Sequence, residues 1–452
     1  MKDLTKGSIT RHLLEMAAPI AAGMIVQTLY FLVDLYFVAR LGDAAIAGVG
    51  AAGSVMFIVV ALTQMLGAGA VALIAQAAGR RDRQDANLVF NQSLVLAGLL
   101  TVVTLVAGYA LAGAYVRRLG ADAATATAGL DYLRWYMPGL ALQFALIAMG
   151  SALRGTGIVR PTMVVQMLSV VVNAILAPIL IAGWGTGRPL GVAGAGLASS
   201  IAVAAGVAWL FYYFVRLEKY VAFHRELLRP RLRVWWRLLD IGLPAGGEFA
   251  LMFLYMAIVY GIIRDFGAAA QAGFGMGSRV MQAISLPAMA IAFATAPVAG
   301  QNFGAGHGAR VRATFRTAIA LGATLMLVLT LLCQIAPAVL LRGFTQDAAV
   351  IGVGTQFLQI VSWNFAASGI VFTCSGLFQA LGNTWPTLLS SAARLLTFAL
   401  PATWLAAQPH FAIAEVWYLS VASVTLQAVL SYALARRQLA LRLRAAPADP
   451  HC

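Results

Sequence analysis

Residues 86–116, ANLVFNQSLVLAGLLTVVTLVAGYALAGAYV, contain no Asp, Glu, Lys or Arg. A helix of about 20 apolar residues crosses the roughly 30 Å hydrocarbon core of a bilayer, and this stretch is longer than that. A second charge-free stretch, residues 348–393, is long enough for two crossings and a turn. Both stretches predict a chain that is embedded in lipid.

The composition of the whole chain supports the same conclusion. Of its 452 residues, 61% are hydrophobic and 10% are charged, and the mean hydropathy is +0.84. A soluble domain has about 25% charged residues, so this chain has too few to cover a surface that faces water. The net charge of +15 does not indicate nucleic-acid binding, because the basic residues are spread over many short loops. We therefore expect the lipid bilayer as a partner and no nucleic acid.

Apolar stretches recur along the chain and predict an all-α integral membrane protein with twelve transmembrane helices. We expect these helices at 13–39, 46–76, 86–116, 126–153, 160–183, 190–215, 238–263, 270–300, 313–341, 348–380, 385–407 and 412–435. Several exceed the length needed for one crossing, so tilts or kinks are expected.

The basic residues divide unevenly between alternate loops. With twelve spans, 22 of the 31 Lys and Arg residues lie in loops on one side, six lie on the other side and three lie within spans. Cytoplasmic loops carry the excess of Lys and Arg, so both termini are expected in the cytoplasm of a bacterial inner-membrane protein.

The chain repeats itself at a constant offset of 225 residues. Residues 41–56 (LGDAAIAGVGAAGSVM) and 266–281 (FGAAAQAGFGMGSRVM) are identical at 8 of 16 positions, and Pro19 falls on Pro244. Six spans in each half make the halves parallel repeats about an axis along the membrane normal. Two such lobes would enclose a cleft and could rock between inward-open and outward-open states.

The repeat suggests four parts of the chain. They are an N-terminal six-helix bundle (1–215), a basic cytoplasmic linker (216–237), a C-terminal six-helix bundle (238–435) and a cytoplasmic tail (436–452).

Charges inside spans are expensive, so each is a functional candidate. Asp34 lies at the far end of the first predicted helix, and Gln27 and Tyr30 share its face, which Gly23 extends. The second repeat has Val259 at the position of Asp34, so the scaffold does not require a carboxylate there. We expect Asp34 to hold a proton or a sodium ion; a structural ion pair with a nearby Arg is the alternative.

Glu248 is the second intramembrane carboxylate, and it aligns with Gly23 of the first repeat. It is a candidate for ion coupling, although it lies near the cytoplasmic start of its helix and could reach the interface. Pro19 removes a backbone hydrogen bond four residues before Gly23, so these two residues predict a hinge in the first helix.

Polar side chains in other spans are candidates for lining the cleft. Gln166, Ser169 and Asn173 share one face of the fifth predicted helix, and Asn364 lies on a similar face of the tenth. Such stripes also form hydrogen bonds between helices. Arg279 in the eighth helix is either a counter-charge to a carboxylate or a side chain that reaches the interface.

Sequence motifs of enzymes are missing. We find no HExxH, no GxSxG and no P-loop. The chain is therefore predicted not to be an enzyme, to need no cofactor, and to move a small-molecule substrate at the expense of an ion gradient. A proton or a sodium ion moving down 100 mV supplies about 2.3 kcal/mol.

The ordered motifs resemble the multidrug and toxic compound extrusion (MATE) family over essentially the whole chain. They are FLVDLYFVARLGDAAIAGVG (31–50), LRGTGIVRPT (153–162), GVAGAGLASS (191–200), AGQNFGAG (299–306) and FQALGNTWPT (378–387). The resemblance implies two bundles around a V-shaped cleft and export of organic, often cationic, compounds in exchange for protons or sodium ions. We expect the chain to act as a monomer.

The resemblance also implies roles for particular residues. Asp34 matches the family's coupling carboxylate in the first helix, and Tyr30 and Asn173 match its polar partners. Pro19 matches the bend of that helix, and Ser199 stands where the family often has Thr.

Three departures weaken the match to particular branches. Ala177 replaces an acid that some members carry four residues after the matched Asn, and the tenth predicted helix has no acid. Glu248 lies one turn before the position of the helix-seven Glu in the NorM-type branch. Arg279, within GSRVMQAISLPAMAI, resembles the DinF-type branch, so proton coupling through Asp34 is expected first and sodium coupling second.

Three rival functions remain open at this point. A lipid-linked oligosaccharide flippase of the same superfamily would need a more basic cleft, and only Arg279 and Arg394 lie deep within spans. A membrane-embedded enzyme would need paired acids or histidines, whereas all five His lie at loops or span ends. Ala177 also allows a paralogue that no longer couples transport to an ion.

Overall fold

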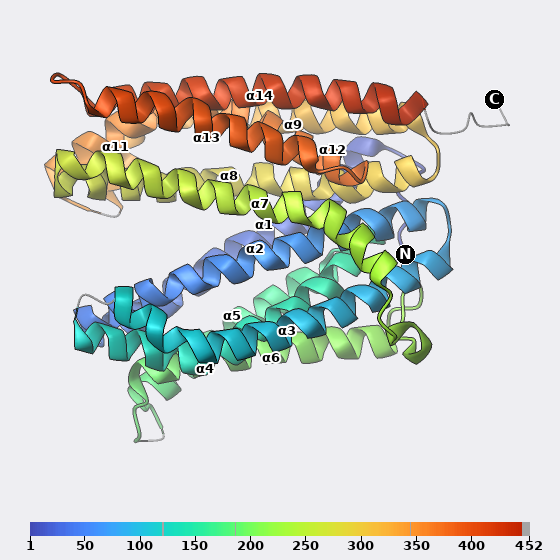
Figure 1. Cartoon of the computed structure of the whole chain (residues 1–452), viewed down its shortest axis with the longest axis horizontal. Coiled ribbons are helices and arrows are strands. Elements are labelled where there is room, and N and C mark those ends of the chain that lie inside the picture. The colour runs from blue at the N-terminus through green and yellow to red at the C-terminus, as the bar shows by residue number, and fades with distance from the viewer. Residues whose placement is uncertain (120–121, 186, 344, 445–452) are drawn as a thin grey trace. The chain divides into compact units, whose positions relative to one another are not determined.

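The computed structural model describes the chain except for residues 120, 121, 186, 344 and 445–452, and except for the side chains of 31, 35, 51, 54, 117–119 and 444. Most of the predicted tail therefore lies outside the described residues. Within the described part, the regular secondary structure is helical throughout (Figure 1).

Thirteen of the described helices are long. They are α1 (Ile9–Ala39), α2 (Asp43–Gly79), α3 (Arg83–Leu119), α4 (Ala123–Gly155), α5 (Arg160–Ala182), α6 (Gly191–Arg216), α7 (Leu232–Ile263), α8 (Ala268–Gly304), α9 (Gly308–Ile335), α11 (Ala348–Val361), α12 (Asn364–Ala380), α13 (Trp385–Ala406) and α14 (Ile413–Arg444). The short ones are η1 (Arg225–Leu228), η2 (Arg264–Phe266) and α10 (Pro337–Arg342). Eleven helices of the described chain could each cross a membrane, and α11 with α12 makes up to twelve, which confirms the predicted fold class.

Two predicted helices differ from the observed ones. The helix expected over 313–341 ends at Ile335, because Pro337 lacks an N–H and disfavours a helical conformation at Ala336, whose ψ is 49°. The helix expected over 348–380 is bent by 56° between Val361 and Asn364.

Side chains of α9 hold the bend between α11 and α12. The hydroxyl of Thr330 donates to the carbonyl of Ser362 at 2.9 Å. The amide of Gln334 donates to the carbonyl of Gln359 at 2.6 Å and to the hydroxyl of Ser362 at 2.8 Å. These bonds satisfy polar groups that a bend exposes in the apolar interior.

The described chain forms two compact units. The first contains Met1–Asp3 and Ala22–Gly242, and the second contains Leu4–Ala21 and the described residues from Leu243 onward. The first part of α1 therefore belongs to the second unit, and the first part of α7 belongs to the first unit. The bundle boundaries predicted from the sequence mark the repeats, and as domain boundaries they stay a prediction.

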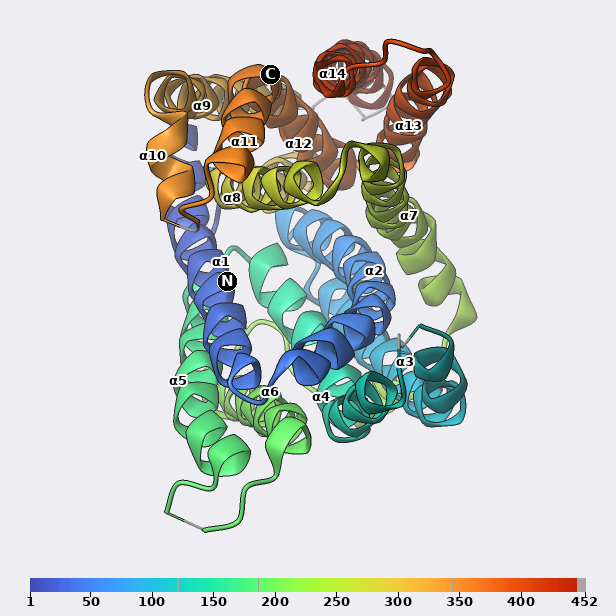
Figure 2. The same ribbon diagram turned by 90° about the vertical axis from the view of Figure 1, so that its left-hand side faces the viewer.

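In each unit, the fourth span of the repeat packs against three other helices. In the first unit, α4 packs against α2, α3 and α6, as Figure 2 shows, and α5 packs against α6. In the second unit, α12 packs against the corresponding helices α8, α9 and α14. The predicted duplication thus extends from the sequence to the packing of the helices.

Glycines allow a close approach of two helices in both units, at positions 225 residues apart. A Cβ atom on Gly48 of α2 would lie 2.6 Å from the backbone nitrogen of Gly129 in α4. At the corresponding crossing, a Cβ atom on Gly273 of α8 would lie 3.0 Å from the carbonyl oxygen of Val350, and Gly354 corresponds to Gly129. Small residues let two helix backbones touch without a hydrophobic driving force between them.

The predicted linker is fastened to the first unit by three buried amides of α3. Asn87, Asn91 and Gln92 each accept an N–H and donate to a carbonyl of the linker segment 220–231, at 2.6–3.1 Å. The segment also contains η1, and α7 begins soon after it. The linker is therefore an integral part of the first unit.

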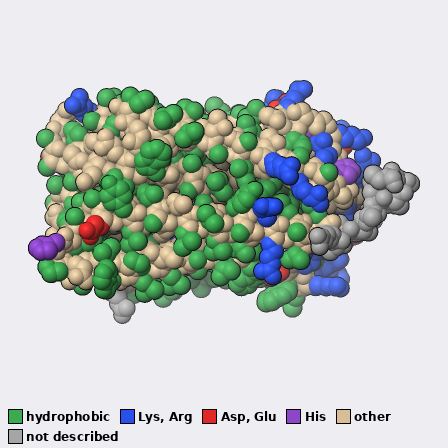
Figure 3. All heavy atoms as spheres, turned by 90° about the horizontal axis from the view of Figure 1, so that it is seen from above, with side chains coloured by type: hydrophobic (Ala, Val, Ile, Leu, Met, Phe, Trp, Pro, Cys, Tyr) green, Lys and Arg blue, Asp and Glu red, His purple; other side chains and the backbone are tan. Residues whose placement is uncertain are grey.

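The surface of the second unit separates apolar and basic regions. The face in Figure 3 shows a broad band of hydrophobic side chains and a gathering of Lys and Arg toward one end. At the start of α9, Arg312 and Arg316 are exposed, and Arg436 and Arg437 are exposed near the end of α14. Apolar belts with basic margins are typical of membrane-spanning bundles.

Candidate functional site

Asp34 is buried within the first unit, with 7% of its surface exposed. Its Oδ1 atom has no hydrogen-bond partner, and its carboxyl forms no ion pair within 4.0 Å, in the part of the chain that is described. The alternative of a structural ion pair with Arg thus has no support from the described residues. A buried carboxyl without a cationic partner is costly, which makes Asp34 a candidate functional group.

Polar groups from four helices surround this carboxyl. Tyr30 on α1, and Tyr132 and Tyr136 on α4, interact electrostatically with Asp34. Ser199 on α6 lies beside Tyr30 and Tyr132. We call these residues, together with Asn173, the Asp34 cluster.

Asn173 completes the Asp34 cluster from α5. Its Nδ2 atom donates to the Ser199 hydroxyl at 3.4 Å, whereas its buried Oδ1 atom has no hydrogen-bond partner in the described chain. Asn173 and Ser199 are both completely buried. The structure therefore places Tyr30, Asn173 and Ser199 in one buried polar group near Asp34, and their roles stay a prediction.

Tyr132 and Tyr136 are members of the Asp34 cluster that the sequence analysis missed. Both are 3% exposed, and their ring centroids are 5.3 Å apart. Two tyrosines one turn apart in a predicted span were the available signal, because a buried phenol needs a polar neighbour.

The other candidates of the first unit lie elsewhere. Gln166 donates to the Oε1 atom of Gln27 at 3.5 Å and occupies the space beside Gly23, where a Cβ atom would lie 1.8 Å from its Oε1. Ser169 donates to the carbonyl of Ala202 on α6 at 3.3 Å. Gly23 is thus a packing residue for Gln166, and the hinge at Pro19 stays a prediction.

The second unit holds a different polar cluster around Glu248. Ser375 on α12 donates to Glu248 Oε2 at 3.4 Å. Ser391 on α13 lies beside the carboxyl, and Arg394 interacts with it electrostatically. Asn364 does not join this cluster directly, since its Nδ2 atom donates to Ser420 at 3.3 Å.

Arg279 is separate from both carboxylates. Its side chain is exposed on α8, and it forms no ion pair within 4.0 Å in the described chain. Arg394 is the cation beside Glu248, so the sequence analysis named a different Arg as the candidate counter-charge.

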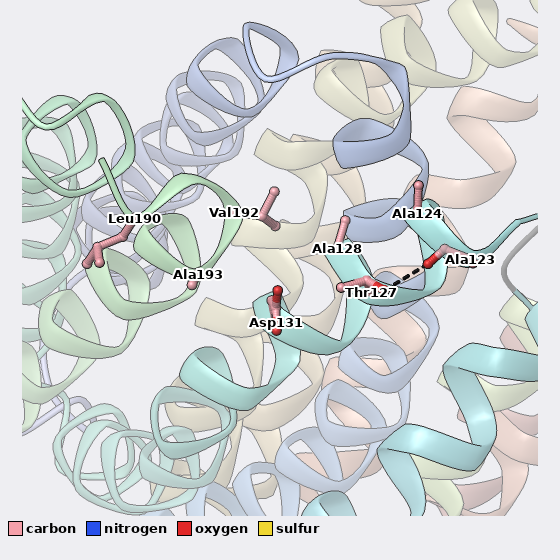
Figure 4. Close-up of a pocket in the computed structure, with 8 residues that line it drawn as sticks. All are labelled: Ala123, Ala124, Thr127, Ala128, Asp131, Leu190, Val192 and Ala193. Carbon is pink, nitrogen blue, oxygen red and sulfur yellow. Dashed lines mark hydrogen bonds between the residues drawn. The ribbon is translucent and has the colours of Figure 1, made fainter. Parts of the chain in front are cut away.

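An open depression of about 490 Å³ lies at the starts of α4 and α6 in the first unit (Figure 4). It is lined by alanines, by Thr127 and by Asp131, and Val192 and Ala193 face them from α6. No member of the Asp34 cluster lines it. Asp131 is therefore a useful control for Asp34.

The model of the MatE family matches the chain twice, at residues 19–179 and 244–405, which begin 225 residues apart. The chain belongs to the MatE family. This is the family that the sequence motifs predicted; the closer match to the DinF-type branch stays a prediction.

Relatives in this family cover most of the chain. A probable multidrug resistance protein of Bacillus subtilis is 26% identical over 85% of this chain and 84% of its own length. An FAD transporter of Shewanella oneidensis is 25% identical over 89% of each chain. A multidrug resistance MATE family transporter solved in an outward-facing conformation superposes with a TM-score of 0.92 at 23% identity, covering 98% of this chain and 99% of that one.

Membership of the MatE family fixes the broad class. The chain is a multi-pass membrane transporter and not an enzyme. The names of the two relatives give different transported compounds, so membership of the family does not identify the substrate of this chain.

Proposed function

We propose that this MatE transporter is a monomeric antiporter that exports small organic, cationic or amphipathic compounds and is driven by protons. The Asp34 carboxyl is the coupling group. Both termini are cytoplasmic, and the transport cycle alternates access by rocking of the two lobes.

The buried, unpaired Asp34 carboxyl carries this proposal. A carboxyl in an apolar surrounding without an Arg or Lys can take and release a proton, or can pair with an organic cation, but it cannot do both at once. Tyrosine, serine and asparagine groups around it can hydrogen-bond to either state. Exclusive binding of a proton or a cationic substrate is what antiport requires.

Sodium is the second candidate for the coupling ion. The unpartnered Oδ1 atoms of Asp34 and Asn173 and the nearby hydroxyls are oxygen ligands, which hard cations prefer. Glu248 is the less favoured coupling residue, because Ser375 donates to its Oε2 atom and Arg394 lies near it, whereas Asp34 has no such cation among the described residues.

The name of the Bacillus subtilis relative supports drug export as the broad activity. The flippase for lipid-linked oligosaccharides remains the alternative, and no contact described above favours it.

Efflux from reconstituted vesicles tests the proposal. We expect a proton gradient to drive efflux of a fluorescent organic cation by the wild type and by Asp131→Asn, whereas Asp34→Asn should lose gradient-driven efflux by at least tenfold. Efflux that responds only to a sodium gradient would replace the proton by sodium. Full activity of Asp34→Asn under either gradient would remove Asp34 from the mechanism.

A further inference from the structure

Arg394 is an intramembrane cation whose hydrogen-bonding capacity is unused. It lies midway along α13, half-buried, with its guanidinium carbon 4.3 Å from the centre of the Tyr255 ring on α7. In the described chain its buried Nε atom has no hydrogen-bond partner, and the guanidinium forms no ion pair within 4.0 Å. A guanidinium has five N–H donors, and leaving them unmet in a membrane protein is expensive.

Glu248 balances this charge without using the donors of Arg394. Its Oε2 atom accepts a hydrogen bond from Ser375 at 3.4 Å, and Ser391 lies beside it. Gln427 on α14 in turn donates to the Ser391 hydroxyl at 3.1 Å and so orients it. The carboxyl is therefore held near Arg394 by Ser375, and the described chain supplies no acceptor for the buried Nε atom of Arg394.

The first unit shows what the fold contains at the equivalent positions. Tyr255 corresponds to Tyr30 at the offset of 225, so both units keep the tyrosine. Arg394 corresponds to Ser169, which forms a hydrogen bond with the backbone of α6. An Arg is thus not needed to build this part of the bundle.

Glu248 and Ser391 replace a contact of the first unit in the same way. Glu248 corresponds to Gly23, and Ser391 corresponds to Gln166. In the first unit the long amide side chain of Gln166 fills the space beside Gly23. In the second unit the long side chain comes from the other helix and carries a charge. The charge of Glu248 therefore stands at a position that a neutral contact fills in the first unit.

We propose that Arg394 binds an anionic group, a carboxylate or a phosphate, of the exported compound, and that Tyr255 orients the guanidinium for this purpose. The Tyr255 ring holds the guanidinium against its face, and a guanidinium presents a fork of N–H groups that matches two oxygens of an anion. Glu248 is the counter-ion in the absence of the compound. This inference rests on the proposed export function and extends the substrates to zwitterionic and anionic compounds.

A matched pair of dyes tests this subsite. A rhodamine methyl ester is a cation, and the corresponding free acid is a zwitterion that differs from it by one carboxylate. Binding of each dye to the purified full-length protein is measured by fluorescence anisotropy in an uncharged detergent. The wild type is compared with Arg394→Gln and with Arg279→Gln, a control for loss of an exposed cation from a helix.

We expect Arg394→Gln to weaken binding of the acid at least tenfold and to leave binding of the ester within about twofold, and Arg279→Gln to change neither. Equal effects of Arg394→Gln on both dyes, or no effect on the acid, would overturn the inference. If Arg394→Gln does not fold, Arg394→Lys retains the charge without the two-pronged edge; it should weaken binding of the acid selectively, and unchanged binding of the acid would contradict the proposal.

The dyes also separate this inference from the proposed function. Failure of the wild type to bind either dye would count against export of organic cations and against the subsite together. Binding of the ester with rejection of the acid would leave the export proposal standing and overturn the subsite.

Discussion

Glycines within the helices of the first unit differ in what surrounds them. A Cβ atom on Gly69 of α2 would lie 2.3 Å from the backbone oxygen of Leu238, which cannot rotate away. A Cβ atom on Gly98 of α3 would meet nothing within 4 Å. The same substitution should therefore have opposite effects at the two positions.

We predict that Gly98→Ala raises the free energy of unfolding, by up to about 1 kcal/mol, because alanine favours helix more than glycine. Gly69→Ala should lower it by about 1–3 kcal/mol, since α2 and α7 must move apart. Thermal unfolding in detergent, followed by tryptophan fluorescence, measures both. A Gly69→Ala variant as stable as Gly98→Ala would contradict the close approach at Gly69.

The sequence identified the charged residue of the Asp34 cluster but not all of its neighbours. Asp34 stands out because a carboxylate in an apolar span is rare and absent from the second repeat. Tyr132 and Tyr136 carry no charge, so their position beside Asp34 depends on how α4 turns within the bundle. The stacking of Arg394 on Tyr255 likewise depends on a tertiary contact that spacing along the chain does not reveal.

At the scale of elements, the bend between α11 and α12 contains no proline. The helix predicted to run through this point is interrupted where α9 donates hydrogen bonds to it. Thr330 and Gln334 donate to the backbone carbonyls of Ser362 and Gln359, which then have partners outside their own helix. Hydropathy predicts where a span lies, but it cannot show that a neighbouring helix will take over its backbone hydrogen bonds.

We predict that Gln334→Leu lowers the free energy of unfolding by about 1–3 kcal/mol, because the carbonyl of Gln359 and the hydroxyl of Ser362 lose the amide that donates to them. Thr403→Val on α13 is the control; its exposed hydroxyl bonds only to carbonyls of its own helix, at 2.9 and 3.0 Å. It should change stability by less than about 0.5 kcal/mol. Equal losses in the two variants in thermal unfolding would show that the α9 contact does not stabilise the bend.

At the scale of the whole chain, the duplication is the feature best predicted from the sequence. The offset of 225 recurs in the family matches, in the helix packing and in the Gly48 and Gly273 crossings. The sequence could not show that α1 and α7 each divide between the two compact units, because contact with a unit is not encoded in hydropathy. Nor could it show that the linker is fixed by amides of α3.

We predict that Asn91→Ala loosens the linker. The substitution leaves the carbonyl of Ala222 and the N–H of His224 without their partners, at a cost of about 1–3 kcal/mol. Trypsin should then cleave faster after Arg225 in the folded protein. Asn383→Ala is a control, because Asn383 accepts only from Trp385 in an exposed turn, at 3.3 Å. Unchanged cleavage in Asn91→Ala would mean that the linker is held by other contacts.

The most direct test of Asp34 as the coupling group is proton release on substrate binding. An organic cation is added to the purified transporter in weakly buffered detergent solution, and a pH-indicator dye reports the protons released. We predict release by the wild type and by Asp131→Asn at a pH where Asp34 is protonated, and no release by Asp34→Asn although it still binds the cation. Equal proton release by Asp34→Asn and the wild type would contradict coupling through Asp34.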